Sequence, residues 1–137
     1  MFMKHKTVTL ISFVLLSVVA VAWIRPAATG NEGGPRLSFA ETDYDFGVLA
    51  PGDEAVHYFV FTNSGDEPMV ILNVRTSCGC MASEWSKKPV VAGAKDSLKV
   101  VYNTKIKGSF SKTITVQSNA LNPSVDLNIR GSVVKTK

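Results

Sequence analysis

Turn-forming residues recur at short intervals after Leu37, and this spacing constrains the fold of the 137-residue chain more than any other feature. Glycine, proline, asparagine and aspartate gather about every 8–12 residues, which is typical of an all-β domain. Between the turns, apolar residues such as Leu98, Val100 and Tyr102 alternate with polar neighbours. No stretch after residue 25 keeps the 3.6-residue apolar period of a helix. We therefore expect two packed antiparallel sheets.

About seven strands are expected, each separated from the next by a turn. The two clearest strands are expected at 55–63, which is rich in valine, tyrosine and phenylalanine, and at 69–75, which contains valine and isoleucine. Several lysines fall at outward positions or in loops, where they protect strand edges from aggregation. The remaining strands are expected at 37–40, 44–49, 96–102, 109–117 and around 125–130.

The amino terminus has the order of an export signal. Lys4 and Lys6 precede the uncharged run 7–24, and Ala20-Val21-Ala22 follows the pattern that a signal peptidase reads. Two interpretations stay open: a signal peptide of residues 1–22 cleaved after Ala22, or an uncleaved membrane anchor extending to Ile24, since Trp23 suits a membrane interface. Both place the remainder in the periplasm or outside the cell. Residues 23–36, with two prolines and three glycines, are expected to be a flexible linker.

Charge is divided unevenly along the chain. Residues 23–86 contain three basic and nine acidic residues, whereas residues 87–137 contain ten basic and two acidic ones. No arginine-rich or aromatic-interleaved stretch accompanies the basic part, so nucleic acid is not an expected partner. We expect the two parts to neutralise each other within one folded domain.

Several ordered motifs resemble an uncharacterised family of exported Ig-like domains common in the Bacteroidetes group of bacteria. The similar stretches cover roughly residues 37–134 and are Asp45-Phe46-Gly47, Phe59–Gly65, Pro68–Ile71, Thr76-Ser77-Cys78-Gly79-Cys80, Phe110–Asn119 and Ile129-Arg130-Gly131. The resemblance implies a single Ig-like β-sandwich related to the major sperm protein and cilia-associated modules, and it implies no activity. Met81 follows the second cysteine where the family usually has threonine.

Cys78-Gly79-Cys80 is the motif of this chain best suited to take part in chemistry. Outside the cytoplasm the two thiols are expected to be oxidised to a disulfide, and Gly79 is expected to supply the sharp backbone for so short a ring. Closing a three-residue loop removes only about 1.6 kcal/mol of unfolded-state entropy. The pair is therefore a local clasp, a redox-active dithiol or a soft-metal site.

A copper(I) site is the metal alternative, because thiolate and thioether ligands suit that ion. Its candidate ligands are Cys78, Cys80, Met81 and His57. His57 is included because the strands 55–63 and 69–75 are expected to run in opposite directions, which places it near the cysteines. Taken alone, His57 is an ordinary strand residue. Trp85 either covers the cysteine loop or belongs to an exposed binding surface.

The sequence offers no constellation typical of an enzyme. With one histidine outside the signal and scattered acids, no Ser-His-Asp or paired-carboxylate set is present, and Gly33-Gly34 is not a phosphate-binding loop. We expect no catalytic residues and no cofactor. The expected partner is another envelope or extracytoplasmic protein, with membrane contact only through an N-terminal anchor, and the alternative function is thiol redox chemistry or copper(I) binding.

Overall fold

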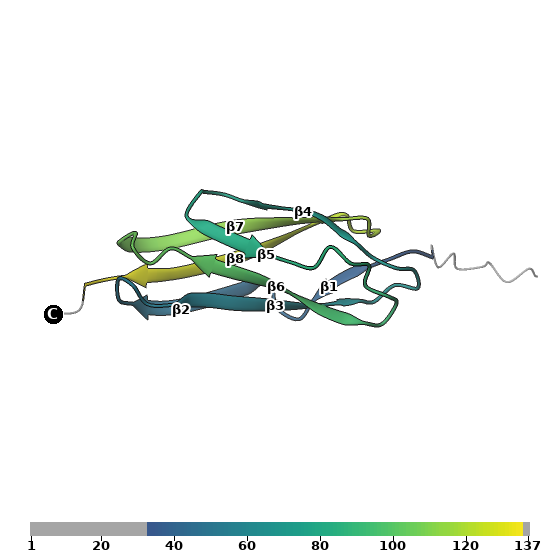
Figure 1. The fold of residues 1–137 in the computed structure, drawn as a ribbon, viewed down its shortest axis with the longest axis horizontal. Coiled ribbons are helices and arrows are strands. Elements are labelled where there is room, and N and C mark those ends of the chain that lie inside the picture. The colour runs from purple at the N-terminus through teal and green to yellow at the C-terminus, as the bar shows by residue number, and fades with distance from the viewer. Residues whose placement is uncertain (1–32, 136–137) are drawn as a thin grey trace, which may run out of the picture. The chain divides into compact units, whose positions relative to one another are not determined.

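Two four-stranded sheets pack face to face in the computed structural model, which describes residues 33–135 (Figure 1). Within those residues there are eight strands and no helix, which confirms the expected all-β sandwich and exceeds the expected count by one. The strands are β1 Leu37–Phe39, β2 Asp43–Leu49, β3 Ala55–Asn63, β4 Ile71–Thr76, β5 Met81–Glu84, β6 Lys95–Tyr102, β7 Gly108–Ser118 and β8 Ser124–Val133.

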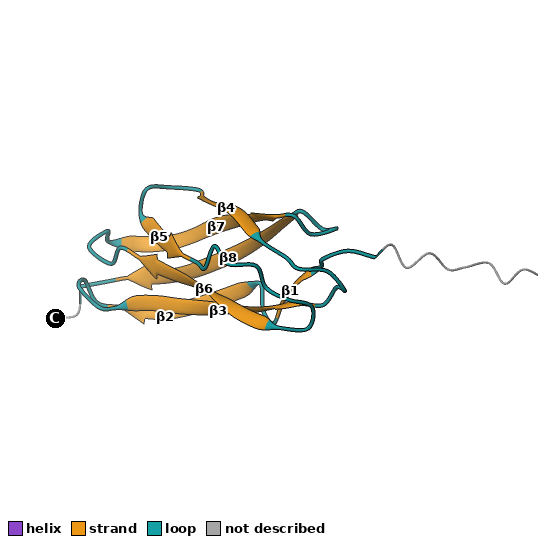
Figure 2. Cartoon of the chain, turned by 45° about the vertical axis from the view of Figure 1, so that its right-hand side comes forward, coloured by secondary structure: helices purple, strands orange, loops and turns teal. Residues whose placement is uncertain are grey.

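Each sheet contains strands from both the early and the late part of the chain. Sheet A has the order β1-β3-β6-β5 and sheet B the order β2-β8-β7-β4 (Figure 2). All pairs are antiparallel except β2 and β8, which run parallel. The edges of the sandwich are therefore β1 and β5 in sheet A, and β2 and β4 in sheet B.

The core is built from the inward half of each alternating pattern. On β6, Leu98, Val100 and Tyr102 are all buried, as their alternation predicts. The ring of Tyr102 stacks on that of Phe110 across the two sheets, with centroids 3.7 Å apart. The other fully buried apolar side chains include Phe59 on β3 and Met69, Ile114, Val116, Leu127 and Ile129, which come from sheet B and the segment before β4.

Two features of the strands differ from expectation. β5 was not predicted, because Met81-Ala82-Ser83-Glu84 contains no β-branched or aromatic residue and pairs only through its contact with β6. The clear strands β3 and β4 lie in different sheets, so residues 64–70 cross from sheet A to sheet B. An isolated bridge between Met69 and Val90 fastens the end of this crossing.

Asn63 holds that crossing from inside the domain. Its side chain is fully buried, and its amide nitrogen donates to the carbonyls of Glu67 and Val90 at 2.6 and 2.9 Å. Its amide oxygen accepts from the backbone N–H groups of Arg36 and Gly65 at 3.2 and 3.1 Å. All polar atoms of this buried side chain are thus paired, as a polar group in a core requires.

The ordered domain includes residues that the sequence predicts as linker. Gly34 and Pro35 are buried. The backbone N–H of Gly34 donates to the Asp66 carboxylate at 2.6 Å, and the Leu121 N–H donates to the Pro35 carbonyl at 2.8 Å. Residues 34–36 therefore pack on the turns at 64–66 and 119–122 and belong to the folded body.

The Asp45-Phe46-Gly47 motif shapes the irregular part of β2. Gly47 has a φ of 70°, and the β2–β8 register shifts between Asp45 and Val48. The Asp45 carboxylate accepts from the Gly47 N–H at 2.8 Å and from Arg130 Nε at 3.1 Å. These two interactions, the Gly47 hydrogen bond first, hold the pKa of Asp45 below its usual value.

The expected signal peptide or anchor, residues 1–24, lies outside the described residues. Across residues 33–135 the structure contains no helix with the length and hydropathy needed to span a membrane.

Candidate functional site

The cysteine motif lies where the chain passes from one sheet to the other. β4, an edge of sheet B, ends at Thr76, and β5, an edge of sheet A, begins at Met81. The four residues between them, Ser77–Cys80, form the crossing, which we call the cysteine loop. In the structure a disulfide joins Cys78 to Cys80, whose Cα atoms are 5.3 Å apart.

Hydrogen bonds attach the cysteine loop to both sheets. On the side of sheet B, the Ser77 N–H donates to the Thr113 carbonyl at 3.0 Å, and the Thr113 N–H donates to the Ser77 hydroxyl at 3.2 Å. The Thr76 hydroxyl donates to the carbonyl of Cys78 at 2.9 Å. On the side of sheet A, the Asn103 N–H donates to the Cys80 carbonyl at 2.9 Å. These hydrogen bonds fix the path of the Thr76–Cys80 motif as the chain passes from sheet B to sheet A.

Gly79 does not have the role that the sequence suggests for it. Its φ lies outside the left-handed region, and a Cβ built on it would meet no atom within 4 Å. The 5.3 Å Cα separation is therefore reached with backbone angles that other residues also adopt. The special backbone that the sequence leads us to expect at Gly79 is therefore not used in this structure.

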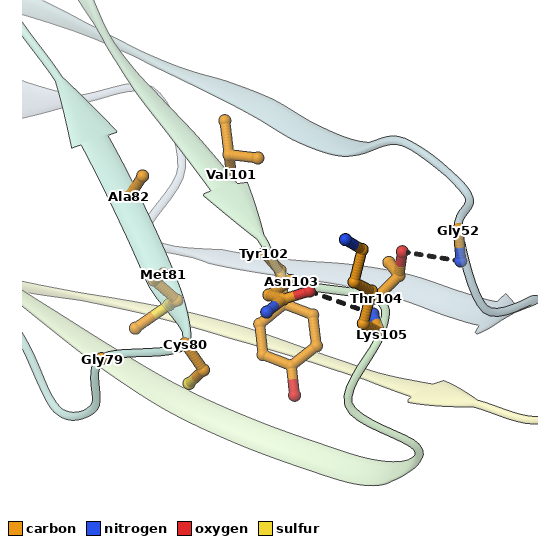
Figure 3. A pocket seen from close by; sticks show the side chains of 10 residues that line it. All are labelled: Gly52, Gly79, Cys80, Met81, Ala82, Val101, Tyr102, Asn103, Thr104 and Lys105. Carbon is orange, nitrogen blue, oxygen red and sulfur yellow. Dashed lines mark hydrogen bonds between the residues drawn. The ribbon is translucent and has the colours of Figure 1, made fainter.

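A pocket of about 410 Å³ opens beside the disulfide (Figure 3). Its size is in the range of pockets that take small molecules or single side chains. β5 and the cysteine loop form one wall, the end of β6 and the following turn form another, and Gly52 closes the far side. The lining is largely apolar, and its residues are Gly52, Gly79, Cys80, Met81, Ala82, Val101, Tyr102, Asn103, Thr104 and Lys105.

The polar groups of the pocket differ in how far they are already engaged. The Thr104 hydroxyl donates to the Asp53 carbonyl at 2.7 Å and accepts from the Gly52 N–H at 3.2 Å. The Asn103 side-chain oxygen accepts from the Lys105 N–H at 3.1 Å, but its amide nitrogen donates to no other described residue. The Lys105 ammonium group makes no ion pair within residues 33–135. Two donors on the rim are therefore available to a ligand.

His57 points to other partners than the cysteines. Both Ala55 and Met81 pair with Tyr102, so the start of β3 and the cysteine loop do lie at the same end of the sandwich. The imidazole Nε2, however, is 2.6 Å from a Glu41 carboxylate oxygen, and the ring stacks on Tyr44. Within the described residues no group of three or more His, Cys, Asp or Glu side chains is placed to hold a metal ion.

Trp85 follows β5 and packs partly buried against the core. Its indole Nε1 is buried and has no hydrogen-bond partner among the described residues. The Trp85 side chain thus covers part of the core just beyond the end of β5.

The sequence alone did not indicate the pocket. Its lining comes from three separate segments, 52, 79–82 and 101–105, and none of them carries a motif of its own outside the cysteines. The pocket can be recognised only once β5 is paired with β6, because this pairing places Ala82 opposite Val101.

The two-sheet architecture, with the chain crossing between edge strands at the cysteine loop, defines an Ig-like β-sandwich domain. The sequence matches the model of the DUF1573 family, described as a protein family of unknown function, over residues 37–133. The chain belongs to that family. A search of curated proteins found no significant match.

Solved structures share the fold at low sequence identity. A human CEP192 ASH/PapD-like domain is 7% identical with a TM-score of 0.65, and the alignment covers 76% of this chain and 89% of that one. The Pseudomonas aeruginosa CupB2 chaperone is 8% identical with a TM-score of 0.53, covering 70% of this chain and 55% of that one. WR4, a major sperm protein family member of Caenorhabditis elegans, is 11% identical with a TM-score of 0.50, covering 72% and 97%.

The expected similarity of fold to the major sperm protein and related Ig-like modules is confirmed. Alignments to two Vibrio cholerae proteases, VesC and VesB, cover 23% and 32% of those chains. Similar sandwiches therefore occur both as separately described domains and as parts of longer chains that are proteases.

Proposed function

We propose that this chain is an exported, non-enzymatic module of the cell envelope that binds another envelope or extracytoplasmic protein. The observation that carries the proposal is the outer face of sheet A. On β3, Tyr58 and Val60 are 53% and 41% exposed, although both side chains are large and apolar. Apolar side chains that cluster on a surface mark protein-interaction sites.

The apolar residues of this face are contiguous in the ladder. Val56 on β3 lies opposite Val101 on β6, and Val101 lies opposite Ala82 on β5. Together with Tyr58 and Val60 these three residues form a band across sheet A, which we call the sheet A band. Lys99, paired with Glu84 at 3.5 Å, supplies charge beside it. A largely apolar band with polar neighbours is the composition of a protein-binding surface.

Export rests on the sequence of residues 1–22, and protein binding is further supported by the fold. The CupB2 protein is named a chaperone, and strand addition to an open sheet edge is one general mode by which a β-sandwich binds a polypeptide.

Site-specific photo-crosslinking in the cells that produce the protein tests this proposal. A photoreactive phenylalanine analogue replaces Tyr58 on the sheet A band or, as the matched control, Ser109 on sheet B. We expect a discrete crosslinked protein from position 58 and none from position 109. Crosslinking of equal yield at both positions, or at neither, would contradict a binding role for sheet A.

Thiol redox chemistry is the second candidate function, and one observation favours it: Cys80 lines the pocket. A substrate thiol bound in the pocket would lie next to Cys80, one of the two disulfide partners. The double variant Cys78→Ser/Cys80→Ser separates the two functions. If it loses the biological activity while its fold and its position-58 crosslink are retained, the binding proposal is insufficient. Copper that remains bound to reduced protein through purification would instead favour the copper(I) alternative with Cys78, Cys80 and Met81.

A further inference from the structure

We propose that a thiolate entering the pocket attacks the sulfur of Cys80, so that Cys78 leaves as the thiolate. This inference rests on the second candidate function, thiol redox chemistry, and assigns a different role to each cysteine. Exchange between a thiolate and a disulfide depends on which sulfur is attacked and on how easily the other sulfur leaves. The two sulfurs of this disulfide differ in both respects.

The two cysteines differ first in their access to the pocket. Cys80 lines the pocket, and Cys78 does not. Figure 3 shows Cys80 where the cysteine loop meets the start of β5, next to Met81. In thiol–disulfide exchange the attacking, attacked and leaving sulfurs lie nearly in line. A thiolate in the pocket has Cys80 between itself and Cys78, so Cys80 is the sulfur that it reaches.

The backbone supplies a hydrogen-bond donor to the sulfur that leaves. The Cys80 N–H donates to Cys78 Sγ at 3.4 Å, whereas within residues 33–135 no hydrogen bond is formed to the Cys80 sulfur. A hydrogen bond to an ionised acceptor is roughly twice as strong as one between neutral groups, so this interaction strengthens as charge develops on Cys78. Departure of Cys78 as the thiolate is therefore favoured over departure of Cys80.

The surroundings of Cys80 favour the same direction. Its neighbours in the pocket wall are largely apolar and include Met81, Ala82 and Val101. A thiolate in apolar surroundings is disfavoured because it loses hydration, whereas the sulfur–sulfur bond of a mixed disulfide carries no charge. The product with the adduct on Cys80 and the charge on Cys78 is therefore the more stable one.

The reaction is a single displacement. The thiolate RS⁻ forms a bond to Cys80 Sγ, the Sγ–Sγ bond breaks, and its electron pair leaves on Cys78. The Cys78 thiolate then takes a proton from water, or it attacks Cys80 Sγ again, expels RS⁻ and restores the ring. Hydrogen bonds of Ser77 with Thr113 and of Cys80 with Asn103 hold both ends of the cysteine loop, so the released sulfur stays near Cys80.

Trapping of the mixed disulfide tests the assignment on the purified exported protein. The oxidised protein is mixed with reduced glutathione, and excess N-ethylmaleimide then alkylates the released thiol before the ring closes again. Peptic digestion in acid and tandem mass spectrometry locate both adducts. We expect glutathione on Cys80 and maleimide on Cys78 in about tenfold excess over the reverse pattern, the effect of one hydrogen bond to a charged group.

Two variants of exposed residues test the part played by the pocket. Ala82 lines the pocket, whereas Ser86, two residues beyond the end of β5, does not. Ala82→Leu should narrow the pocket and slow the reaction with 2-mercaptoethanol, an uncharged thiol, severalfold. Ser86→Leu is the matched control and should react at the wild-type rate. Thermal melting checks that each variant is folded.

The thiol is carried either by a small molecule or by a cysteine residue of a protein, and a second probe distinguishes these sources. The same trapping is repeated with a heptapeptide that contains one cysteine. An adduct on Cys80 from glutathione alone assigns the site to small thiols, and adducts from both probes extend it to cysteine residues.

Glutathione found equally or mainly on Cys78, or equal rates for Ala82→Leu and Ser86→Leu, would overturn the assignment while leaving thiol redox chemistry as a candidate function. A disulfide that a phosphine reduces but thiols do not, or a protein isolated with two free thiols, would overturn both. The position-58 crosslink tests the binding proposal independently of all these outcomes.

Discussion

Gly65 and Gly79 both lie in loops between strands but have very different surroundings. A Cβ on Gly65 would overlap the carbonyl oxygen of Gly34 and come within 2.7 Å of the Arg36 nitrogen, whereas a Cβ on Gly79 would enter open space. We expect Gly65→Ala to lower the free energy of unfolding by more than about 2 kcal/mol, since backbone atoms must move. Gly79→Ala should change it by less than about 0.5 kcal/mol.

Urea denaturation of both variants measures this difference, and peptide mapping shows whether the Gly79→Ala protein still forms the Cys78–Cys80 disulfide, as we expect. A large loss of stability at Gly79 alone would mean that the ring does require glycine.

Asp45 makes stability depend on pH. Because its pKa is lowered in the folded state from the ordinary value of 3.8, its contribution is complete above that value and is lost as the pH falls through the folded-state pKa. We expect Asp45→Asn to melt at a lower temperature than the wild type at neutral pH, and the two melting curves to converge in acid. Thermal melts across this range test it, and a difference that stays constant down to the most acidic pH would show that charge on Asp45 has no part.

At the scale of elements, the cysteine loop joins the edges of two sheets that already pack through a large core. The disulfide should therefore adjust stability rather than determine folding. We expect Cys78→Ser/Cys80→Ser to lose about 1–2 kcal/mol, because the closed loop is so short. For a domain of about 100 residues this corresponds to roughly 4–12 °C in melting temperature.

Non-reducing peptide mapping of freshly isolated protein accompanies that measurement. It should find Cys78 and Cys80 in one peptide whose mass is two hydrogen masses below that of the dithiol. A disulfide-linked dimer, or two free thiols, would refute the intramolecular pairing.

The strands with strong alternation could be predicted from sequence, and those fixed by tertiary context could not. β3, β6 and β7 carry large apolar residues on one face, and these inward residues are the ones found buried. β5 has no such pattern and exists because β6 offers it a ladder. The pocket follows from the same pairing, so the residues of its rim, Asn103 and Lys105, carried no signal in the sequence.

At the scale of the whole domain, the uneven charge of the sequence is distributed over both sheets. Each sheet interleaves strands from the acidic and basic parts of the chain. Within residues 33–135, two ion pairs join those parts, Lys99 with Glu84 and Arg130 with Asp45. Folding thus brings opposite charges together, which favours neutralisation over a single basic face.

The boundary of the folded domain is a prediction at the same scale. A protein that begins at Gly33 keeps the contacts of Gly34 with Asp66 and of Pro35 with Leu121, whereas one that begins at Leu37 loses them. Removing residues 33–36 also leaves the buried Asn63 oxygen without the Arg36 N–H. We expect the shorter protein to fold but to be less stable by about 1–3 kcal/mol, measured by urea denaturation. Equal stability would place the boundary at Leu37.

Processing at the amino terminus decides whether the exported domain that we propose is released or stays attached to the membrane. The small residues Ala20 and Ala22 follow an uncharged run, and this order predicts cleavage after Ala22. Intact-mass analysis of the exported protein should then give a chain that begins at Trp23. A mass that retains the run 7–24 would establish the anchor instead, and the domain would stay attached to the membrane through residues 25–32. In both cases the export that we propose exposes the cysteine pair to an oxidising compartment, where a disulfide persists. Recovery of the protein in the cytoplasm with both thiols reduced would contradict export itself.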